Sequence, residues 1–326
     1  MQEFIIGVDI GGTKIAAGLV SKEGKLKQKV VVPTFAPRGL NVSLNQVYQS
    51  ITDLIKISKV DREKIKGIGV CAPGPLDPIK GIVHNPPNLF GWREVPLVSL
   101  LRKKFGKRTK LENDANAAGM AELIWGAAKG YKHVLYVTVS TGIGTAVIIN
   151  GRIFHGKNGM AGEGGHVTID YNAKHARCNC GNIGCIEALA SGPNTVKRMI
   201  ARFKKNPGTK TNIVDMVDGE LDKITMITIG EAAEEGDLFA LQAIAEEGEL
   251  LGIWLGGMVN VLDPEIIVIG TGQNGAMAPP HQSDFQNRDG GKEIELIAEP
   301  TPKAIETYNE KVKEGKRVNA LIHTTC

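Results

Sequence analysis

One pattern occurs twice in this 326-residue chain: a β-rich run, a short turn containing glycine and threonine, and a second β-rich run. The first copy is VDIGGTKIAAGLV at 8–20, and the second is VTVSTGIGTAVII at 137–149. Apolar runs on both sides of a glycine-containing turn are typical of two antiparallel strands. The repetition therefore predicts two α/β domains, each of which contains such a hairpin.

The segments around the first copy are those of an α/β domain. Three short β-rich runs near the N-terminus are separated by tight turns, which predicts three antiparallel neighbours. A later stretch has apolar residues at helical spacing and therefore one buried face. In chain order we expect strands at 4–10, 14–20, 26–32, 65–72 and 110–113, helices at 44–58 and 114–128, and a long Pro- and Gly-rich loop at 73–92.

The second domain is expected to begin near Tyr131. Its first two strands form a hairpin, and the second of them ends at Asn150-Gly151, a favoured two-residue turn. Further on, a long helical stretch and a strand that runs into glycines are expected at 228–262 and 264–272. The predicted domains are 1–130 and 131–272, followed by an atypical tail at 273–326 with a loop and a helix starting at Thr301-Pro302.

Composition limits the class of protein. With 42% hydrophobic residues and a net charge of +4, the chain is typical of a soluble globular protein. Neither a secretory signal pattern nor an apolar stretch of roughly 20 residues occurs, so we expect a cytoplasmic protein without a membrane partner. The one basic run, 102–110, is interpreted as a solvated helix end and loop, and no nucleic-acid partner is expected.

The glycine-threonine turns can bind phosphate. Glycine lets backbone N–H groups approach a ligand closely, and a threonine hydroxyl adds a donor, so two such turns could hold one polyphosphate. Each turn alone is weak evidence, because glycine-rich hairpins are more often purely structural turns. Asp9 precedes the first turn directly, where a hydrated Mg²⁺ that bridges phosphates needs a carboxylate.

A second candidate group is Asn113 and Asp114, at the end of a predicted strand and the start of a predicted helix. Asp114 can be a helix N-cap. It can also be a general base that accepts a hydroxyl proton during phosphoryl transfer. Position alone leaves both interpretations open.

Three of the five cysteines are close together, at Cys178, Cys180 and Cys185. In a reducing compartment such clustering indicates a metal site more often than disulfides. With one imidazole these thiolates would form a Cys₃His set, which is typical of structural zinc. Position leaves His166 and His175 as the two candidates for the fourth ligand.

Taken in order, VDIGGTK, CAPGPLD, ENDANAA, STGIG, AGEGGH and CNCGNIGC resemble the signature motifs of the ROK family, which contains bacterial glucokinases, other sugar kinases and sugar-responsive repressors. The resemblance runs from residue 4 to about residue 272. It implies a two-domain α/β fold like that of actin and hexokinase (ribonuclease H-like), with sugar bound in the cleft between the domains and ATP across it. It also implies a homodimer.

The resemblance also implies roles for individual residues. Asp114 resembles the catalytic base, and His166 resembles the histidine that binds zinc in the family. The other assignments are sugar ligands at Asn113, Asp114, Glu163, His166 and Glu187, phosphate ligands at Gly11, Gly12, Thr13, Lys14, Thr141 and Gly142, and zinc ligands at His166, Cys178, Cys180 and Cys185.

The resemblance implies phosphorylation of a hexose by Mg·ATP, with glucose to glucose 6-phosphate as the favoured reaction. The alternatives are a kinase for another hexose or N-acetylhexosamine (N-acetylmannosamine, N-acetylglucosamine, fructose or allose) and a catalytically silent sugar-binding protein. A repressor of this family would carry a helix-turn-helix ahead of VDIGGTK, and with the first strand at residue 4 we do not expect one. The tail after residue 272 departs from the family pattern.

Overall fold

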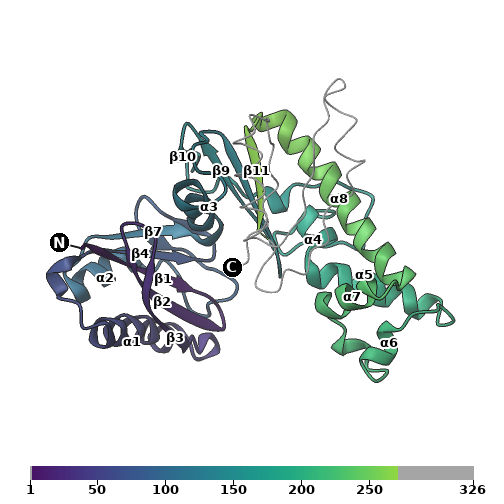
Figure 1. Ribbon diagram of the computed structural model, residues 1–326, viewed down its shortest axis with the longest axis horizontal. Coiled ribbons are helices and arrows are strands. Elements are labelled where there is room, and N and C mark those ends of the chain that lie inside the picture. The colour runs from purple at the N-terminus through teal and green to yellow at the C-terminus, as the bar shows by residue number, and fades with distance from the viewer. Residues whose placement is uncertain (1, 271–326) are drawn as a thin grey trace. The chain divides into compact units, whose positions relative to one another are not determined.

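A computed structural model describes residues 2–270 and divides them into two compact units (Figure 1). The first unit runs to Ala121 and includes Phe154–Ala161. The second comprises Glu122–Ile153 and the described residues from Gly162 to Gly270. The predicted tail at 273–326 and the last two residues of the strand expected at 264–272 lie outside the described residues.

The first unit contains a five-stranded sheet with the strand order β3-β2-β1-β4-β7. The three N-terminal strands are antiparallel neighbours, as predicted, whereas β4 and β7 continue the sheet in parallel with β1. The bounds are β1 Phe4–Ile10, β2 Lys14–Ser21, β3 Leu26–Pro33, β4 Ile65–Ala72 and β7 Thr109–Asn113. Because β1, β4 and β7 are parallel, their carboxyl ends lie at one edge of the sheet.

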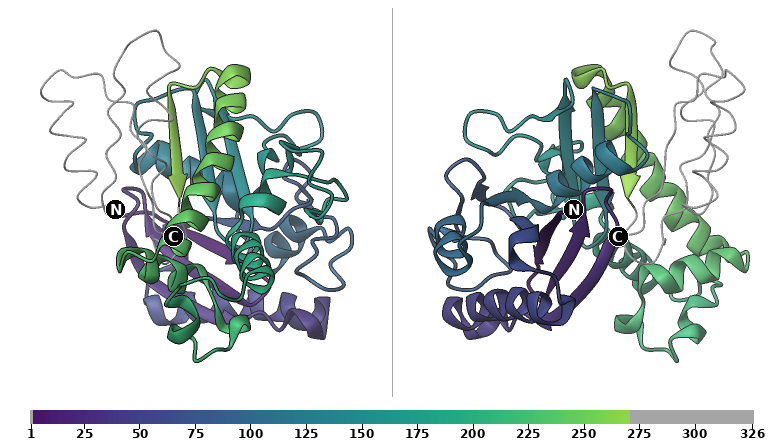
Figure 2. Two further views of the ribbon diagram at one scale, coloured as in Figure 1. Left: turned by 90° about the vertical axis from the view of Figure 1, so that its right-hand side faces the viewer. Right: turned by 60° about the vertical axis from the view of Figure 1, so that its left-hand side comes forward.

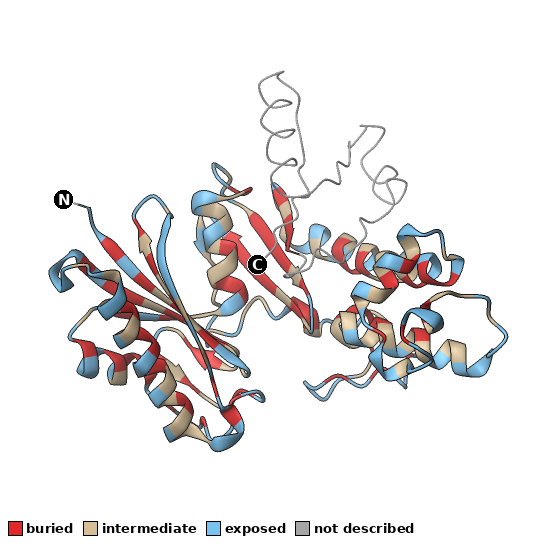
Figure 3. Cartoon of the chain, turned by 60° about the horizontal axis from the view of Figure 1, so that its bottom comes forward, coloured by how far each residue is buried: buried red, intermediate tan, exposed pale blue. Residues whose placement is uncertain are grey.

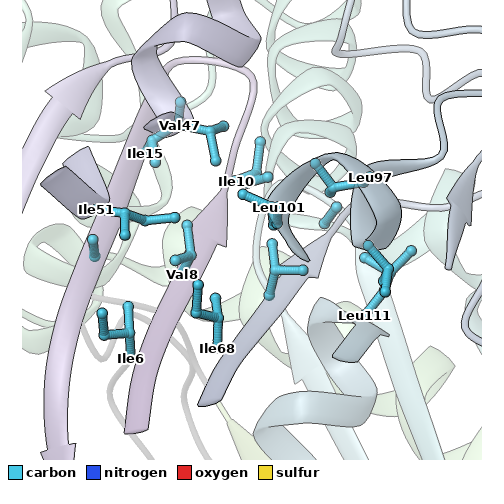
Figure 4. Close-up of a cluster of buried hydrophobic side chains, with 14 of the residues drawn as sticks. Ile6, Val8, Ile10, Ile15, Val47, Ile51, Ile68, Leu97, Leu101 and Leu111 are labelled. Atoms are coloured by element: carbon cyan, nitrogen blue, oxygen red, sulfur yellow. The ribbon is translucent and has the colours of Figure 1, made fainter. Parts of the chain in front are cut away.

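The core of this unit lies between the sheet and its helices, α1 (Leu40–Ser58) and α2 (Leu97–Phe105). Alternate residues of β1 are buried, and in α1 the buried residues follow one another at intervals of three or four positions (Figure 3). Ile6 and Val8 of β1 belong to the same buried cluster as Ile51 of α1 (Figure 4). The helix begins four residues before the predicted start.

The long loop predicted at 73–92 contains a short hairpin of β5 (Leu76–Asp77) and β6 (Ile82–Val83). Trp92 is fully buried, and its indole N–H donates to the Ser43 hydroxyl of α1 over 2.7 Å. This bond fixes the end of the loop on the helix layer.

The second unit contains a four-stranded sheet of order β10-β9-β8-β11. The strands are β8 Val134–Val139, β9 Ile143–Ile149, β10 Arg152–Ile153 and β11 Ile266–Gly270. Asn150 and Gly151, with φ of 53° and 71°, make the predicted turn between β9 and β10. Helix α8 (Leu238–Leu262) lies along this sheet and packs Leu251, Trp254 and Leu255 into its core (Figure 2).

The helical stretch predicted at 228–262 is two helices, α7 (Met226–Glu234) and α8. Gly236, with φ of 88°, ends the first, and the Asp237 carboxylate caps the second by accepting from the Ala240 N–H over 2.8 Å. Three other helices of the second unit precede them: α4 Ile186–Ala190, α5 Gly192–Lys205 and α6 Ile213–Met216. None of the helices within residues 2–270 has the length and apolar character needed to cross a membrane.

Helix α8 also buries a carboxyl group, Glu247, whose residue is only 3% exposed. Burial raises the pKa of Glu247 to about 7, and the opposing charge of Arg198 on α5 only partly offsets this. An acid whose pKa is raised on folding destabilises the fold progressively as pH rises from its unfolded pKa to its folded pKa. Glu247 therefore costs stability at neutral and higher pH.

We expect Glu247→Gln to stabilise the protein at pH 8 by on the order of 2 kcal/mol and to have little effect at pH 4.5, where the carboxyl is protonated in the fold. Urea unfolding at both pH values measures this difference. Glu249→Gln, on the same helix, is a control expected to change little at either pH. A Glu247→Gln effect that is equal at both pH values would contradict the assignment.

Candidate functional site

The carboxyl edge of β1, β4 and β7 brings together most of the first unit's candidate residues. Asp9 pairs with Cys71 in the parallel register of β1 and β4, and Cys71 pairs with Glu112 of β7. Asp114 follows β7 directly as the first residue of helix α3 (Asp114–Trp125). The sheet register thus places Asp9 and Asp114, which are distant in sequence, at the same edge.

Asp9 and Asp114 interact electrostatically. Both side chains reach solvent, but the surrounding protein desolvates them enough that burial raises the pKa of each carboxyl above its usual range. The charge of Asp9 raises the pKa of Asp114 further, whereas the Ala115 N–H opposes the shift. For Asp9, hydrogen bonding from Cys71 and the charge of Lys14 oppose it. A carboxylate with a raised pKa is a stronger base.

Cys71 is a member of this group that the sequence analysis did not single out. Its thiol donates to the Val8 carbonyl over 3.5 Å and to Asp9 Oδ1 over 3.6 Å. Burial, followed by the charges of Asp9 and Asp114, holds the pKa of the Cys71 thiol well above its usual range. The thiol therefore stays protonated at neutral pH and acts as a donor to Asp9.

Asp114 shares the N-cap role at the start of α3 with Asn113. Asn113 Oδ1 accepts from the backbone N–H groups of Ala115 over 2.9 Å and Asn116 over 3.4 Å. Asp114 Oδ1 also accepts from Ala115, over 2.8 Å. Because Asn113 satisfies the first turn of α3, Asp114 is not required as its sole cap.

The first glycine-threonine turn joins β1 to β2. The Gly11 N–H donates to the Lys14 carbonyl over 3.0 Å. Thr34 closes the other side, since its hydroxyl donates to the Gly11 carbonyl over 2.6 Å and its N–H to the Thr13 carbonyl over 2.9 Å. The turn is thus held by two backbone bonds and the Thr34 hydroxyl, while Thr13 and Lys14 are exposed and available to a ligand.

The second turn joins β8 to β9 and is held by a carboxylate. Glu187 Oε2 accepts from the Ile143 N–H over 3.0 Å, and it lies so close that a Cβ on Gly142 would be 2.6 Å away. The Ser140 carbonyl, at the start of the turn, accepts from Gly192, the first residue of α5, over 2.9 Å. Glu187, predicted as a sugar ligand, is therefore also part of the support of the second phosphate turn.

The three sugar ligands predicted in the second unit lie together. His166 Nε2 is 3.9 Å from Glu163 Oε2, and His166 Nδ1 is 3.9 Å from Glu187 Oε1. Glu163 directly precedes the short 3₁₀ segment Gly164–His166, which ends at His166, and Glu187 is in the first turn of α4. The remaining two, Asn113 and Asp114, are in the first unit.

The four predicted metal ligands also come together. The ligand atoms of His166, Cys178, Cys180 and Cys185 all lie within 4.8 Å of one another. Cys178 Sγ is 3.4 Å from His166 Nδ1, and Cys180 Sγ is 3.6 Å from Cys185 Sγ. Of the two histidines left open by position, the structure brings His166 into the group. Three thiols and one imidazole at this spacing fit a tetrahedral zinc ion.

The loop that carries the cysteines is folded back on itself by backbone bonds. The Gly184 N–H donates to the Ala176 carbonyl over 2.8 Å, and the Cys178 N–H donates to the Asn182 carbonyl over 2.9 Å. Cys185 then leads directly into α4, which begins at Ile186. The cysteine cluster and Glu187 are therefore parts of one local structure.

Comparisons with known proteins agree with this architecture. The model of the ROK family matches residues 5–280. A glucokinase of Thermotoga maritima is 35% identical over 82% of this chain and 81% of the relative. A xylose repressor of Bacillus spizizenii is 32% identical over 82% of this chain but 63% of the repressor. The structure of a ROK family glucokinase from Streptomyces griseus, in complex with glucose and AMPPNP, is 31% identical, with a TM-score of 0.70 over 82% of this chain and 83% of that one.

These similarities confirm the predicted fold class, the α/β fold of the actin-like ATPases and ROK hexokinases. The family match covers more than half of the chain, and the matched residues include both glycine-threonine turns and the cysteine loop. The chain therefore belongs to the ROK family.

Proposed function

We propose that this protein is an ATP-dependent sugar kinase that phosphorylates glucose to glucose 6-phosphate, with Asp114 as the general base. The observation that carries the proposal is the placement of Asp114 beside Asp9 at the carboxyl edge of β1, β4 and β7. The glucokinases among its relatives and the glucose and AMPPNP complex of a similar protein support the same reaction.

In this proposal Asp114 accepts the proton of the reacting sugar hydroxyl as the γ-phosphoryl group is transferred. The side-chain N–H of Asn113 would donate to a sugar hydroxyl while its Oδ1 caps α3. The raised pKa of Asp114 serves this role, because a stronger base accepts the proton more readily at neutral pH. Product formation therefore depends on the ionised form of Asp114.

The two turns would bind the ATP phosphates. The exposed Thr13 hydroxyl and Lys14 ammonium are donors at the first turn, and the backbone of Thr141 and Gly142 provides donors at the second. The nearby first turn of α5 adds N–H groups, which favour an anion. Asp9, as a solvent-accessible carboxylate, fits a hydrated Mg²⁺, which would neutralise charge on the phosphates.

Glu163, His166 and Glu187 provide acceptors and a donor for further sugar hydroxyls. His166 can serve both predicted roles because its two nitrogens face different groups. Nδ1 lies by Cys178 in the metal-ligand group, and Nε2 lies on the side of Glu163. Holding one nitrogen would fix the ring and orient the other toward the sugar.

Zinc would be held by the four ligands His166, Cys178, Cys180 and Cys185. A four-ligand set leaves no open position, so the ion would serve structure and not the chemical step. All four ligands lie between Glu163 and Glu187 in the chain, and the site would therefore preorganise the sugar contacts.

A second candidate function is sugar binding without transfer, which the similarity to xylose repressors favours. A polar set of carboxylates, an amide and an imidazole also suits several hexoses and N-acetylhexosamines. An ADP-release assay with Mg·ATP over a panel of these sugars separates the alternatives. The kinase proposal predicts sugar-dependent ADP release that is highest with glucose. A folded protein that binds sugar but releases no ADP with any of them would support the silent binder.

Gly142→Ala tests the second phosphate turn. A Cβ at this position would displace the Glu187 carboxylate, a flexible group, so the fold should persist while the bond to the Ile143 N–H is lost. We expect the KM for Mg·ATP to rise about tenfold, the effect of losing roughly one charge-assisted hydrogen bond. Gly7→Ala, where a Cβ would enter open space, is the control. Equal KM values for the two variants would contradict the assignment.

A further inference from the structure

One segment of the chain contributes to the first unit although both its flanks belong to the second. The chain leaves the second unit after Ile153, contributes Phe154–Ala161 to the first unit, and re-enters the second at Gly162. The segment is a closed loop, because the Ala161 N–H donates to the His155 carbonyl over 3.1 Å. A Cβ on Gly159 would lie 2.6 Å from Pro78 Cδ, so this part of the loop packs tightly against the β5 region.

His155 attaches the start of this loop to β7, the strand that directly precedes the proposed catalytic base. Its Nε2 lies 2.8 Å from Glu112 Oε2. The other oxygen of Glu112 accepts from the Asn113 backbone N–H and from the Asn116 side-chain amide, each over 3.0 Å. Asn116 is buried in the first turn of α3. Glu112 therefore connects His155 to the residues on both sides of Asp114.

The chain that follows the loop is fixed at a different place. The Thr145 hydroxyl of β9 donates to the Gly162 carbonyl and accepts from the Gly164 N–H, the latter over 2.9 Å. Glu163, a proposed sugar ligand, lies between these two anchored residues. A short stretch of chain thus connects His155, which is bonded to Glu112 of β7, to Gly162, which is bonded to Thr145 of β9.

We infer that His155 is a positioning residue for the transfer reaction, acting through Glu112 on Asn113 and Asp114. His155 holds one oxygen of Glu112, so that the other oxygen remains bonded to Asn113 and Asn116. Because these two residues are then fixed, the Asp114 carboxylate can adopt fewer orientations. The same bond ties the loop leading to Glu163 to the strand leading to Asp114. The inference rests on the proposed kinase function.

The chemistry of the pair supports this role. A histidine side chain and a carboxylate that are each about one-quarter exposed, at 29% and 25%, are shielded enough for their bond to persist but are not part of the core. Without His155 the carboxylate of Glu112 can rotate toward water and leave Asn113 and Asn116 without their acceptor. Small errors in the orientation of a catalytic group reduce the rate of the chemical step more than ground-state binding.

The test compares His155→Ala with His84→Ala. His84 forms a bond of the same kind with Glu94, over 2.7 Å, in a part of the first unit that does not adjoin Asp114 in the chain or the sheet. We expect His155→Ala to lower kcat by roughly ten- to a hundredfold with the KM for Mg·ATP within twofold. His155→Gln, which keeps an N–H donor, should recover part of the loss, and His84→Ala should resemble wild type.

A double-mutant cycle and amide hydrogen exchange extend the test. With Glu112→Gln the effect of His155→Ala should shrink, because the two residues act as one unit. The amides of Ala115 and Asn116 should exchange faster in His155→Ala and not in His84→Ala. Wild-type kcat in His155→Ala, a loss confined to the KM for sugar, or unchanged amide exchange would overturn the inference.

ADP release and amide exchange test the kinase function and the role of His155 separately. Wild-type protein without sugar-dependent ADP release would refute the proposed function, whatever the variants do. Exchange at Ala115 and Asn116 would still decide the structural step: faster exchange in His155→Ala would support the coupling through Glu112, and unchanged exchange would overturn it.

Discussion

Asp114→Asn is expected to lower kcat about a thousandfold, because positioned general bases contribute roughly 10²- to 10⁴-fold and an amide cannot accept the hydroxyl proton. The fold should persist, since the Asn side chain retains an oxygen that can accept from the Ala115 N–H and Asn113 still caps α3. Steady-state ADP release with saturating glucose and Mg·ATP measures the loss. Sugar affinity, measured by calorimetry, should change little.

Asp61→Asn is the matched control for this variant. Asp61 is also an aspartate at a helix start, and its carboxylate accepts from the Glu63 N–H, but it is exposed and lies at the amino end of β4. We expect wild-type kcat in Asp61→Asn. Asp114→Asn with more than one-tenth of wild-type turnover would contradict the assignment of the base.

The pH dependence follows from the same residue. Burial and the charge of Asp9 raise the pKa of Asp114, so the base loses activity by protonation at a higher pH than an ordinary aspartate would. The acid limb of the kcat/KM profile should therefore lie above the usual aspartate range, with activity falling as pH falls through the raised pKa. This limb should be absent from the residual activity of Asp114→Asn.

Disruption of the cysteine cluster is expected to have the largest effect on stability. Removal of zinc with a chelator, or Cys178→Ser, should lower the free energy of unfolding by about 4 kcal/mol, as is typical for loss of a structural metal. The corresponding fall in Tm is on the order of 10 °C at roughly 2–4 °C per kcal/mol. Calorimetry with and without chelator measures the change.

Elemental analysis gives an independent readout for the cluster. We expect one zinc per wild-type chain and a clear deficit in Cys178→Ser. Cys71→Ser should retain full zinc, because Cys71 lies by Asp9 in the first unit and is not among the four grouped ligands. Full zinc in Cys178→Ser, or wild-type protein whose Tm is insensitive to chelation, would contradict a structural zinc site.

Local sequence signals were sufficient to predict the hairpins. Turn glycines and alternating apolar residues depend on neighbours in the chain, and they correctly gave the antiparallel β1–β2–β3 arrangement and the Asn150-Gly151 turn. The helix predicted at 228–262 was too long because apolar residues at helical spacing occur on both sides of 234–237, and this short polar stretch was included in the helix. The left-handed Gly236 and the cap at Asp237 end one helix and begin the next there.

In the candidate site, contacts between side chains that are distant in sequence could not be predicted. Asp9 was predicted from its position before the first turn, and Asp114 and the four metal ligands from the motifs; the structure places these residues in two groups. Cys71 and the His155–Glu112 pair were missed because each depends on register or on contact between distant segments. Glu187 was assigned to the sugar alone, since nothing in the sequence shows that its carboxylate meets the Ile143 N–H.

Identification of the product is the measurement that decides whether this protein is a glucose kinase. The protein would be incubated with Mg·ATP and glucose and the mixture followed by ³¹P NMR, with Asp114→Asn as the matched sample. We predict a sugar 6-phosphate resonance that grows in step with ADP and is nearly absent in Asp114→Asn. ADP accompanied only by inorganic phosphate, or no product from folded protein that binds glucose, would contradict the kinase assignment.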